Sequence, residues 1–600
     1  MNILGISDSH EAHACIVQDG EILAAVAEER FSRVKSDMGY PKKAIENVLE
    51  ITKLDPKDID LVAFAGEKGD ILDRIFRPNA YMKVKDWIEQ SYKYWGPILL
   101  EGKSLSPVDN YNLFKHLRGD DIYRDPYYSY IKKDIFLAVD NKSELLRKAR
   151  IETVHQHLKI NTEKIRFFRH EDCHKAYGLL SSPNDLEEAI VLTLEGGGDD
   201  SSATFSIFKN DEITEIWKSN SVNLGRLYRY VTLILGMLPS QHEYKVMGLA
   251  PYGNEYHGNK SKKFFDSLSE VKGTEIINTN KVKDLYFSVK ESLEGERFDG
   301  IAWGLQTHLE EVLCQWVENC IKETNIKNVI ISGGVGQNIK ACKTLIDKTS
   351  LKYLWAGPIC GDGSLGIGAA WLATLDKKNS KKIKGYKTIY LGKSYSDDEV
   401  EEAVSRNRLK EKYHIIENPN IKTIASWINK GNICARFSER MEFGQRALGN
   451  RSIIADPRKW ESVERVNKKI KYRDFWMPFT PSMTFEQANK IIINPKNIYS
   501  PFMTMAFDIN DDYIKSIPAA IHPSDKTVRP QMLKYEDNPK YYKLLQAFGE
   551  LSGLECLMNT SFNLHGEAIV ENPEQAISTF IRSELDILLF DKIAISREPL

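Results

Sequence analysis

Two histidines with helical spacing are the first residues that indicate chemistry. His170 and His174 are four residues apart, which on a helix places both imidazoles on one face, close enough to share a metal ion. A predicted buried strand follows and ends in Glu195 and three glycines, which let a metal or a phosphate approach the backbone closely. A histidine pair on a helix is more often structural, so a metal site needs support from the rest of the chain.

Two segments of the chain have the same order of predicted elements. In each, a strand, a polar loop and a two-stranded hairpin follow one another. The strands are predicted at 2–7, 13–17 and 21–27 in the first segment, and at 190–194, 203–208 and 213–217 in the second. This repetition is typical of a duplicated actin-like ATPase fold, in which two halves close over a nucleotide, although any two β-hairpins look alike. His10 lies in the first polar loop, where loop hydrogen bonding is the alternative to catalysis.

Two later segments run from a strand through glycines into a helix. The first, 328–338, contains Gly333, Gly334 and Asn338, and the second, 352–370, contains Asp362 and Gly363. Free amides and the helix dipole at such junctions bind phosphate well, although small residues also serve close packing. Asp362 could cap the following helix or bind a metal.

The C-terminal third of the chain is rich in arginine. Arg436, Arg440, Arg446, Arg451 and Arg458 are followed by Lys471 and Arg473. Arginine forks match phosphate oxygens, and the alternatives are a solvated basic face or an RNA-binding patch. Apolar residues and glycines alternate with these arginines, which favours a half-buried site for a small anion. The amide and hydroxyl groups of 559–563 could bind a carbamoyl group or an adenine edge.

Composition limits the classes of protein. Six hundred residues predict two to four domains, and a formal net charge of −2 gives no field that favours nucleic acid. The eight cysteines show no CxxC pair, so we expect reduced thiols in a cytoplasmic enzyme. We expect neither a signal peptide nor a membrane span. Residues 68–150 are interpreted as an insertion that shapes an acceptor pocket or is merely structural, and the lysine-rich segment 376–385 as a domain boundary.

Taken in order, the motifs resemble those of the NodU/CmcH family of O-carbamoyltransferases, which includes the tobramycin carbamoyltransferase. The matching segments are Gly5–Glu11, Glu28–Arg30, His170 with His174, Lys245–Gly253, Ser332–Asn338, Gly361–Gly368, Arg440–Ser452 and Asn559–Asn563. The resemblance implies an α/β fold with a duplicated actin-like domain at 1–380, fused to an α+β, YrdC-like domain at 381–600. It implies that the C-terminal domain makes carbamoyl-adenylate from carbamoyl phosphate and ATP with Mg²⁺, and that the N-terminal domain transfers the carbamoyl group to a hydroxyl.

The resemblance also implies roles for individual residues. His10 would be the catalytic base. A divalent metal, iron(II) in the family, would be bound by His170, His174, Glu195 and Asp362. The nucleotide in the N-terminal domain would contact Lys245, Gly333, Gly334, Asn338 and Gly363. Carbamoyl phosphate and ATP would contact Arg440, Arg446, Arg451, Lys471, Arg473, Arg529, Asn559, Ser561 and Asn563.

The chain also departs from the family pattern. Glu11 and Glu195 stand where the family has aspartate, and Asp199 stands where it has glutamate. Gln445 and Met477 replace a proline and an arginine, and the segment 522–527 is altered. These changes suggest a divergent subfamily with an unusual small-molecule acceptor. Carbamoylation of a nucleic-acid base, threonylcarbamoyl transfer to tRNA and an inactive nucleotide-binding partner are the alternatives, and a homodimer is left open.

Overall fold

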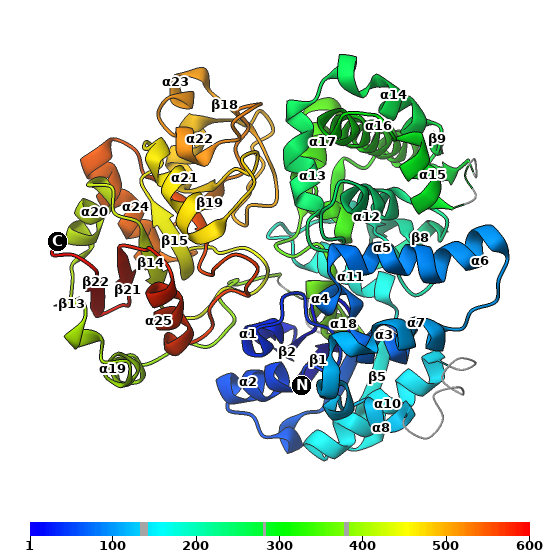
Figure 1. The fold of residues 1–600 in the computed structure, drawn as a ribbon, viewed down its shortest axis with the longest axis horizontal. Helices are drawn as coiled ribbons and strands as arrows, with labels where there is room; N and C mark the ends of the chain where they lie inside the picture. Colours follow the sequence, from blue (N-terminus) through cyan, green and yellow to red (C-terminus); the bar gives the residue numbers. More distant parts are fainter. Residues whose placement is uncertain (132–141, 280–281, 283, 377–382, 384) are drawn as a thin grey trace. The chain divides into compact units, whose positions relative to one another are not determined.

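The chain forms two compact units. The computed structural model describes all residues except 132–141, 280–281, 283, 377–382 and 384 (Figure 1). Unit 1 comprises Met1–Ser32 and Ser36–Lys387, and unit 2 comprises Arg33–Lys35 and Thr388–Leu600. The domain boundary expected between residues 380 and 381 lies outside the described residues.

Within its described residues, unit 1 contains two five-stranded sheets with the same strand order. The orders are β3-β2-β1-β4-β5 and β8-β7-β6-β11-β12. The strands are β1 Asn2–Ser7, β2 His13–Gln18, β3 Glu21–Ala27, β4 Leu61–Ala65, β5 Ile165–Phe168, β6 Glu188–Leu194, β7 Ala203–Lys209, β8 Glu212–Ser219, β11 Asn328–Ser332 and β12 Tyr353–Ala356. In both sheets the three strands of the hairpin segment pair antiparallel and the last two join in parallel. The repetition predicted from the sequence is therefore confirmed in the order of the strands.

Helices cover these sheets, and a helix follows each of the two strand–glycine segments, as the sequence predicts. The helices of unit 1 are α1 Glu29–Ser32, α2 Lys42–Thr52, α3 Ile71–Phe76, α4 Pro78–Tyr81, α5 Val84–Gln90, α6 Gly96–Glu101, α7 Pro107–Phe114, α8 Tyr128–Ile131, α10 Lys142–Leu158, α11 His170–Leu180, α12 Leu224–Ile234, α13 Glu243–Leu249, α14 Glu255–Asp266, α15 Leu285–Ser292, α16 Phe298–Thr324, α17 Ile339–Lys348 and α18 Leu365–Leu375. A two-stranded sheet, β9 Ser269–Lys272 with β10 Glu275–Asn278, completes the unit. The described part of the insertion at 68–150 is mainly helical, from α3 to α10.

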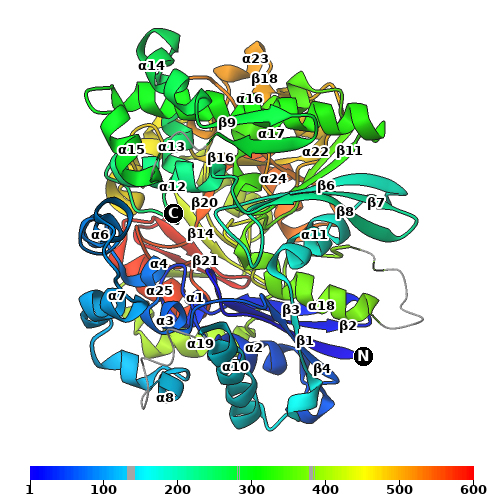
Figure 2. The same cartoon turned by 90° about the vertical axis from the view of Figure 1, so that its right-hand side faces the viewer.

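Close packing of α18 explains the glycines in its first turns. This helix packs on β1, β4 and α11 (Figure 2). A Cβ atom at Gly368 would lie 2.2 Å from the carbonyl oxygen of Cys173 in α11, and one at Gly5 in β1 would lie 2.2 Å from the carbonyl oxygen of Gly366. The glycines at 366 and 368 therefore let a helix approach its neighbours, which was the alternative to phosphate binding in this segment.

Unit 2 is built on an eight-stranded mixed sheet of order β13-β22-β21-β14-β15-β20-β16-β19. Its strands are β13 His414–Glu417, β14 Cys434–Phe437, β15 Arg451–Ala455, β16 Thr480–Thr484, β19 Gln531–Leu533, β20 Cys556–Ser561, β21 Ile587–Leu589 and β22 Ile593–Ser596, with a small pair β17 Ile492–Ile493 and β18 Asp508–Ile509. Its helices are α19 Asp397–Arg406, α20 Ile421–Asn429, α21 Trp460–Val466, α22 Phe485–Ile491, α23 Asp511–Ile514, α24 Pro539–Ser552 and α25 Pro573–Arg582. Two buried apolar clusters hold this unit together, one containing Phe580 of α25 and the other Phe548 of α24.

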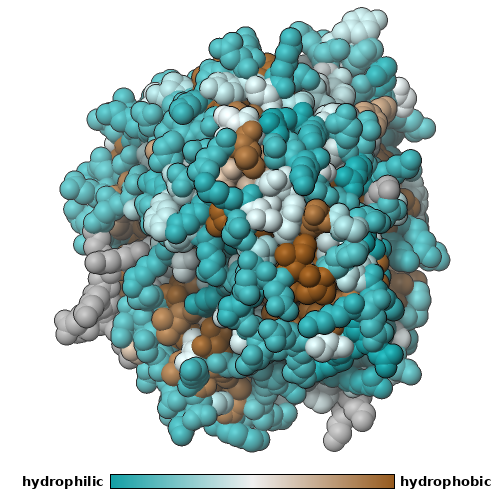
Figure 3. Space-filling model, turned by 90° about the vertical axis from the view of Figure 1, so that its left-hand side faces the viewer, coloured by the Kyte–Doolittle hydropathy of each residue, from teal (hydrophilic) through white to brown (hydrophobic). Residues whose placement is uncertain are grey.

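The surface carries both hydrophilic and hydrophobic residues. The face shown in Figure 3 is covered mainly by hydrophilic side chains, and its hydrophobic residues form small separate groups. Among the described residues, no helix has both the length and the apolar character needed to cross a bilayer.

Candidate metal centre and anion site

Four side chains of unit 1 converge on one point. His170, His174, Glu195 and Asp362 each offer an atom within 4.8 Å of the atoms offered by the others. Oε2 of Glu195 lies 2.9 Å from Nε2 of His170 and 3.1 Å from Nε2 of His174. Oδ1 of Asp362 lies 3.7 Å from both imidazole nitrogens. The structure therefore brings together the four residues that the resemblance implies as ligands.

The topology explains why residues so far apart in sequence meet here. The two histidines occupy the first turns of α11, which begins directly after β5. Glu195 follows the carboxyl end of β6 and Asp362 follows β12, two strands that run parallel within one sheet. Carboxyl ends of parallel strands meet at the same edge of a sheet, where ligands usually bind.

Electrostatics in this cluster favour a bound cation. Burial alone would lower the pKa of His170, but the carboxylates of Glu195 and Asp362 outweigh it and raise that pKa to about 10. The pKa of His174 is raised by the same balance. Burial opposes ionisation of Glu195 and Asp362, yet the two histidines hold the pKa of each carboxyl below its ordinary value. Positive charge between the two carboxylates is therefore stabilising.

Unsatisfied atoms test whether a metal fits. Among the described residues, Nε2 of His174 and Oε1 of Glu195 are buried, and neither has a hydrogen bond of good geometry, although Nε2 of His174 lies 3.1 Å from Oε2 of Glu195. Two imidazoles and two carboxylates are a donor set that suits divalent transition metals such as iron(II) or zinc. The residues present therefore fit a divalent metal ion.

His10 lies in the loop after β1, next to the insertion. Its Nδ1 is 3.4 Å from the amide nitrogen of Asn79 in α4, and the amide oxygen of Asn79 is 3.5 Å from the guanidinium of Arg229. The imidazole of His10 is among the groups that lower the pKa of Asp362. This environment lies within electrostatic reach of the four-residue cluster.

The loop of His10 is anchored by a residue that sequence reasoning did not single out. Asp8 is fully buried and accepts hydrogen bonds from Arg150 at 2.5 and 2.8 Å and from the hydroxyl of Tyr127 at 2.9 Å. Arg74 donates to it at 3.2 Å. All three donors belong to the insertion, so the insertion supports the loop that carries His10.

The residues expected to contact a nucleotide in unit 1 have mixed surroundings. Gly333 has φ +88°, and a Cβ there would lie 2.5 Å from the carbonyl oxygen of Leu194 at the end of β6. Position 333 therefore requires glycine. Gly334 has open space around its Cβ position, whereas a Cβ at Gly363 would lie 2.8 Å from Oε2 of Glu11. Lys245 is half-buried on α13.

Asn338 has a structural function in addition to any role at a ligand. Its Oδ1 accepts from the backbone N–H of Ala341 and so caps α17. Its amide also exchanges two hydrogen bonds with Gln306 of α16, at 2.9 and 3.0 Å. These bonds hold the loop after β11 against the long helix.

Unit 2 contains a buried lysine surrounded by oxygen atoms. Nζ of Lys471 contacts the carbonyl and hydroxyl oxygens of Ser561 and the carbonyl and amide oxygens of Asn563. Burial lowers the pKa of Lys471 well below its ordinary value, and the nearby charges of Arg473 and Lys35 lower it further. Such a cation gains stability when an anion binds beside it.

Two further predicted residues lie in or bond to β20, the strand that ends at Ser561. The guanidinium of Arg473 donates to Oγ1 of Thr560 at 2.9 Å and lies over the ring of Phe479. Asn559 in β20 donates from its amide nitrogen to Ala447 and Ser482, and its Oδ1 is buried without a hydrogen bond among the described residues. A buried acceptor of this kind is costly unless a ligand donates to it.

The predicted arginines of unit 2 do not form a single set. Arg451 is fully buried in β15, lies 3.6 Å from the ring centroid of Phe437, and donates to backbone carbonyls, including that of Ser438 at 2.7 Å. Arg440 donates to the carbonyls of Leu391 and Gly392. Arg446 is half-buried in the loop between β14 and β15, and Arg529 precedes β19.

Three carboxylates near these sites were not predicted, and those of Glu171 and Glu442 are buried. Glu171 and Asp199 bond to backbone beside the four-residue cluster, and Glu442 accepts from the N–H groups of Leu448 and Arg451 at 2.6 and 3.1 Å. Their signal in the sequence is slight: each is an acidic residue inside a motif whose other members were assigned chemistry. Position in a motif alone does not distinguish a ligand from a residue that shapes the loop.

Comparisons with known proteins cover nearly the whole chain. Residues 2–371 match the family described as Carbamoyltransferase N-terminus, and residues 425–597 match Carbamoyltransferase C-terminus. An uncharacterized protein of Methanocaldococcus jannaschii is 31% identical over 99% of this chain and 99% of its own length. Nodulation protein NolNO of Sinorhizobium fredii is 27% identical over 98% of this chain and 79% of its own length. A structure of full-length HypF, bound to phosphate and nucleotide, is 14% identical with a TM-score of 0.28, covering 40% of this chain and 51% of that one. The chain therefore belongs to the carbamoyltransferase family and is an enzyme that transfers a carbamoyl group.

Proposed function

We propose that the protein is an ATP-dependent O-carbamoyltransferase with one half-reaction in each unit. Unit 2, as a YrdC-like domain, converts carbamoyl phosphate, ATP and water into carbamoyl-adenylate, phosphate and pyrophosphate. Unit 1, as an actin-like domain, transfers the carbamoyl group to a hydroxyl of a small-molecule acceptor and releases AMP. The convergence of two histidines and two carboxylates in unit 1 of a carbamoyltransferase is the observation that carries the proposal.

In unit 2, cations and one unsatisfied acceptor support the first half-reaction. Lys471 and Arg473, with Arg440, Arg446 and Arg529, would neutralise and align two polyanions, which bind with Mg²⁺. Oδ1 of Asn559 is suited to accept a hydrogen bond from the carbamoyl NH₂ group, because it is buried and has no hydrogen-bond partner among the residues that the structure describes. Ser561 and Asn563 hold Lys471 in place by their oxygens. Arg451 would contribute by donating hydrogen bonds to backbone carbonyls of the loop between β14 and β15.

In unit 1, His170, His174, Glu195 and Asp362 would hold a divalent metal, iron(II) by the family resemblance. Such an ion, when bound, supplies Lewis-acid polarisation and neutralises charge. His10 would accept the proton of the acceptor hydroxyl as its oxygen attacks the carbamoyl carbon and AMP leaves. Gly334, whose Cβ position is open, would leave room for the adenylate, Gly333 and Gly363 would contact it through their backbone, and Lys245 would offset its charge.

The first test needs no acceptor. Incubation of the protein with ATP, Mg²⁺ and carbamoyl phosphate should release pyrophosphate, and the release should depend on carbamoyl phosphate. His10→Ala should keep this release and lose transfer by about 10²-fold or more, as expected for removal of a general base. His116→Ala, an exposed histidine of the insertion, is the matched control and should behave as the wild type. Absence of pyrophosphate release from metal-loaded protein would refute the proposal, and equal loss of both activities in His10→Ala would refute the division between units.

A further inference from the structure

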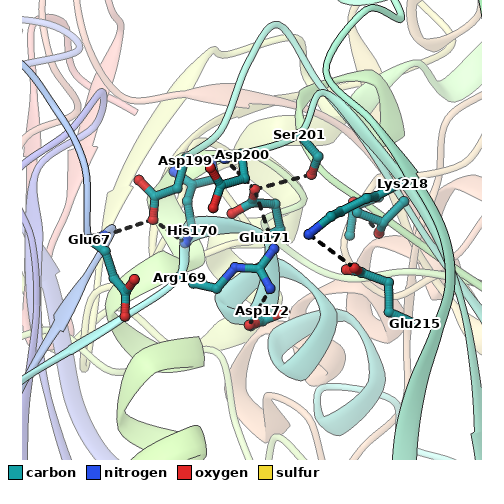
Figure 4. Close-up of polar contacts among 12 residues, drawn as sticks. Glu67, Arg169, His170, Glu171, Asp172, Asp199, Asp200, Ser201, Glu215 and Lys218 are labelled. Atoms are coloured by element: carbon teal, nitrogen blue, oxygen red, sulfur yellow. Dashed lines mark hydrogen bonds and ion pairs between the residues drawn. The ribbon is translucent and has the colours of Figure 1, made fainter.

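Asp199 joins three segments of unit 1 through backbone amides. Its Oδ2 accepts from the N–H groups of His170 at 2.9 Å and Glu67 at 2.7 Å (Figure 4). Its Oδ1 accepts from the N–H of Lys68 at 3.0 Å. Glu67 and Lys68 follow β4 of the first sheet, and Asp199 lies in the loop after β6 of the second sheet. One carboxylate therefore links the two repeated halves beside the metal cluster.

Glu171 makes the reciprocal connection from the helix to the loop. It is fully buried in the first turn of α11, and its Oε1 accepts from the N–H of Asp200 at 2.6 Å and from the hydroxyl of Ser201 at 3.1 Å. Figure 4 shows this side chain directed from α11 toward the loop that carries Asp199 and Ser201. The loop and the helix thus each hold the backbone of the other.

The connected residues are immediate neighbours of the ligands. Asp199 bonds to the backbone of His170 itself, and Glu171 is the next residue along the helix. The loop held by this pair begins at Glu195, whose N–H donates to the carbonyl of Ser202 at its other end. Any change in the distance between loop and helix therefore changes the distance between Glu195 and His170.

We infer that Asp199 and Glu171 form a positioning clamp that sets the separation of the metal ligands contributed by α11 and by the loop after β6. The inference rests on the metal assigned in the proposed function, and neither residue of the clamp is assigned as a ligand. Hydrogen bonds to a charged acceptor are stronger than neutral ones, so three amides on one carboxylate fix its segments firmly. Partners that orient metal ligands typically change metal affinity by about 10- to 100-fold when they are removed.

The test compares two adjacent aspartates of the same loop. Asp199→Ala removes all three bonds, and Asp199→Asn is a second variant of nearly unchanged size that replaces one acceptor oxygen by a donor. Asp200→Ala is the matched control, because the side chain of Asp200 pairs with Lys68 at the surface while its backbone stays bonded to Glu171. Co²⁺ is the probe, since its visible absorption reports the arrangement of its ligands.

Both Asp199 variants should bind Co²⁺ about 10- to 100-fold more weakly than the wild type and give an altered spectrum, whereas Asp200→Ala should match the wild type. In metal-free protein, hydrogen exchange at the amide of His170 should be faster than in the wild type in Asp199→Ala and in neither of the other two variants. Wild-type affinity and spectrum in both Asp199 variants, or an equal loss in Asp200→Ala, would overturn the clamp. A wild-type protein that takes up no Co²⁺ would instead refute the assigned metal, and exchange in metal-free protein would still decide whether Asp199 holds α11.

Discussion

At the scale of single residues, Lys471 has the least ordinary environment among the predicted anion-binding groups. Its ammonium is buried among oxygens of Ser561 and Asn563, and the described residues show no carboxylate bonded to it. Burying a charge without an opposite charge is costly, and the lowered pKa expresses that cost. The opposite charge is expected from the substrate, which makes Lys471 a residue prepared for a polyanion.

This environment predicts that ATP binding takes up a proton. At a pH between the lowered pKa of Lys471 and the ordinary lysine value of about 10.4, the Lys471 side chain of the free protein is partly unprotonated. A bound polyanion raises that pKa, so up to about one proton should enter with the nucleotide. Calorimetric titration in two buffers of different ionisation enthalpy measures this proton uptake, at a pH above that at which the phosphates of ATP titrate.

Lys471→Met should abolish the dependence of the binding enthalpy on the buffer. Lys468→Met, a change at an exposed neighbour, should keep that dependence. A binding enthalpy of the wild type that does not depend on the buffer would contradict the prediction.

At the scale of elements, the insertion works as a support for the loop of His10. Helices α3 and α10 contribute Arg74 and Arg150, and both bond to the buried carboxylate of Asp8, two residues before His10. Burial alone would raise the pKa of Asp8, but Arg150, Arg74 and Tyr127 outweigh it and lower that pKa. The sequence left two interpretations of this insertion open, and these bonds favour a structural function for its described part.

Breaking this ion pair should destabilise unit 1 strongly. Asp8→Asn leaves Arg150 buried without its charge partner, which costs about 3–5 kcal/mol. Because the folded pKa of Asp8 lies below the unfolded value, the contribution is full above about pH 4 and is lost as the pH falls below it. The gap in free energy of unfolding between wild type and Asp8→Asn should therefore narrow in acid. Chemical denaturation across pH measures this, with Asp211→Asn in an exposed turn as the control, and a gap that widens on acidification would contradict the assignment.

The elements could be predicted from sequence far better than the contacts between them. Strands such as 2–7 and 190–194 are short apolar runs bounded by turn residues, so local pattern was sufficient. The spacing of His170 and His174 likewise placed both on one helical face. That Glu195 and Asp362 join them depends on strand order, which the duplicated pattern and the family resemblance supplied and spacing did not.

Bonds to distant backbone escaped prediction for a physical reason. Asp199 accepts from residues more than 100 positions earlier, and a backbone N–H carries no signal in side-chain sequence. Residue type also leaves the role of an arginine open: Arg451 stands in an arginine-rich motif typical of phosphate binding, and it donates to the backbone carbonyls of Ser438 and Glu439. Which arginines face a ligand is decided by tertiary structure.

At the scale of the whole molecule, each proposed site is built from one unit alone. The four proposed metal ligands and His10 belong to unit 1, and Lys471, Asn559 and Asn563 belong to unit 2. The residues matched by the two carbamoyltransferase families fall in the same two units, except Arg33–Lys35, which belong to the N-terminal match and to unit 2. A substitution in one site should therefore leave the chemistry of the other intact.

This separation predicts that two inactive variants restore activity when they are mixed. His10→Ala should still make carbamoyl-adenylate in unit 2, and Lys471→Met should still transfer from it in unit 1, so the mixture should carbamoylate an acceptor while neither variant alone does so. Recovery should rise with the concentration of both proteins, because the intermediate must pass between molecules. Mass spectrometry of an acceptor mixture after incubation with ATP and carbamoyl phosphate measures the gain of a carbamoyl group. His10→Ala mixed with a second unit 1 variant, His174→Ala, is the matched control and should stay inactive. Two results would contradict the prediction: activity in that control mixture, or no activity in the first mixture although each variant keeps its own half-reaction. Either result would show that the two half-reactions are not divided between the units with a released intermediate.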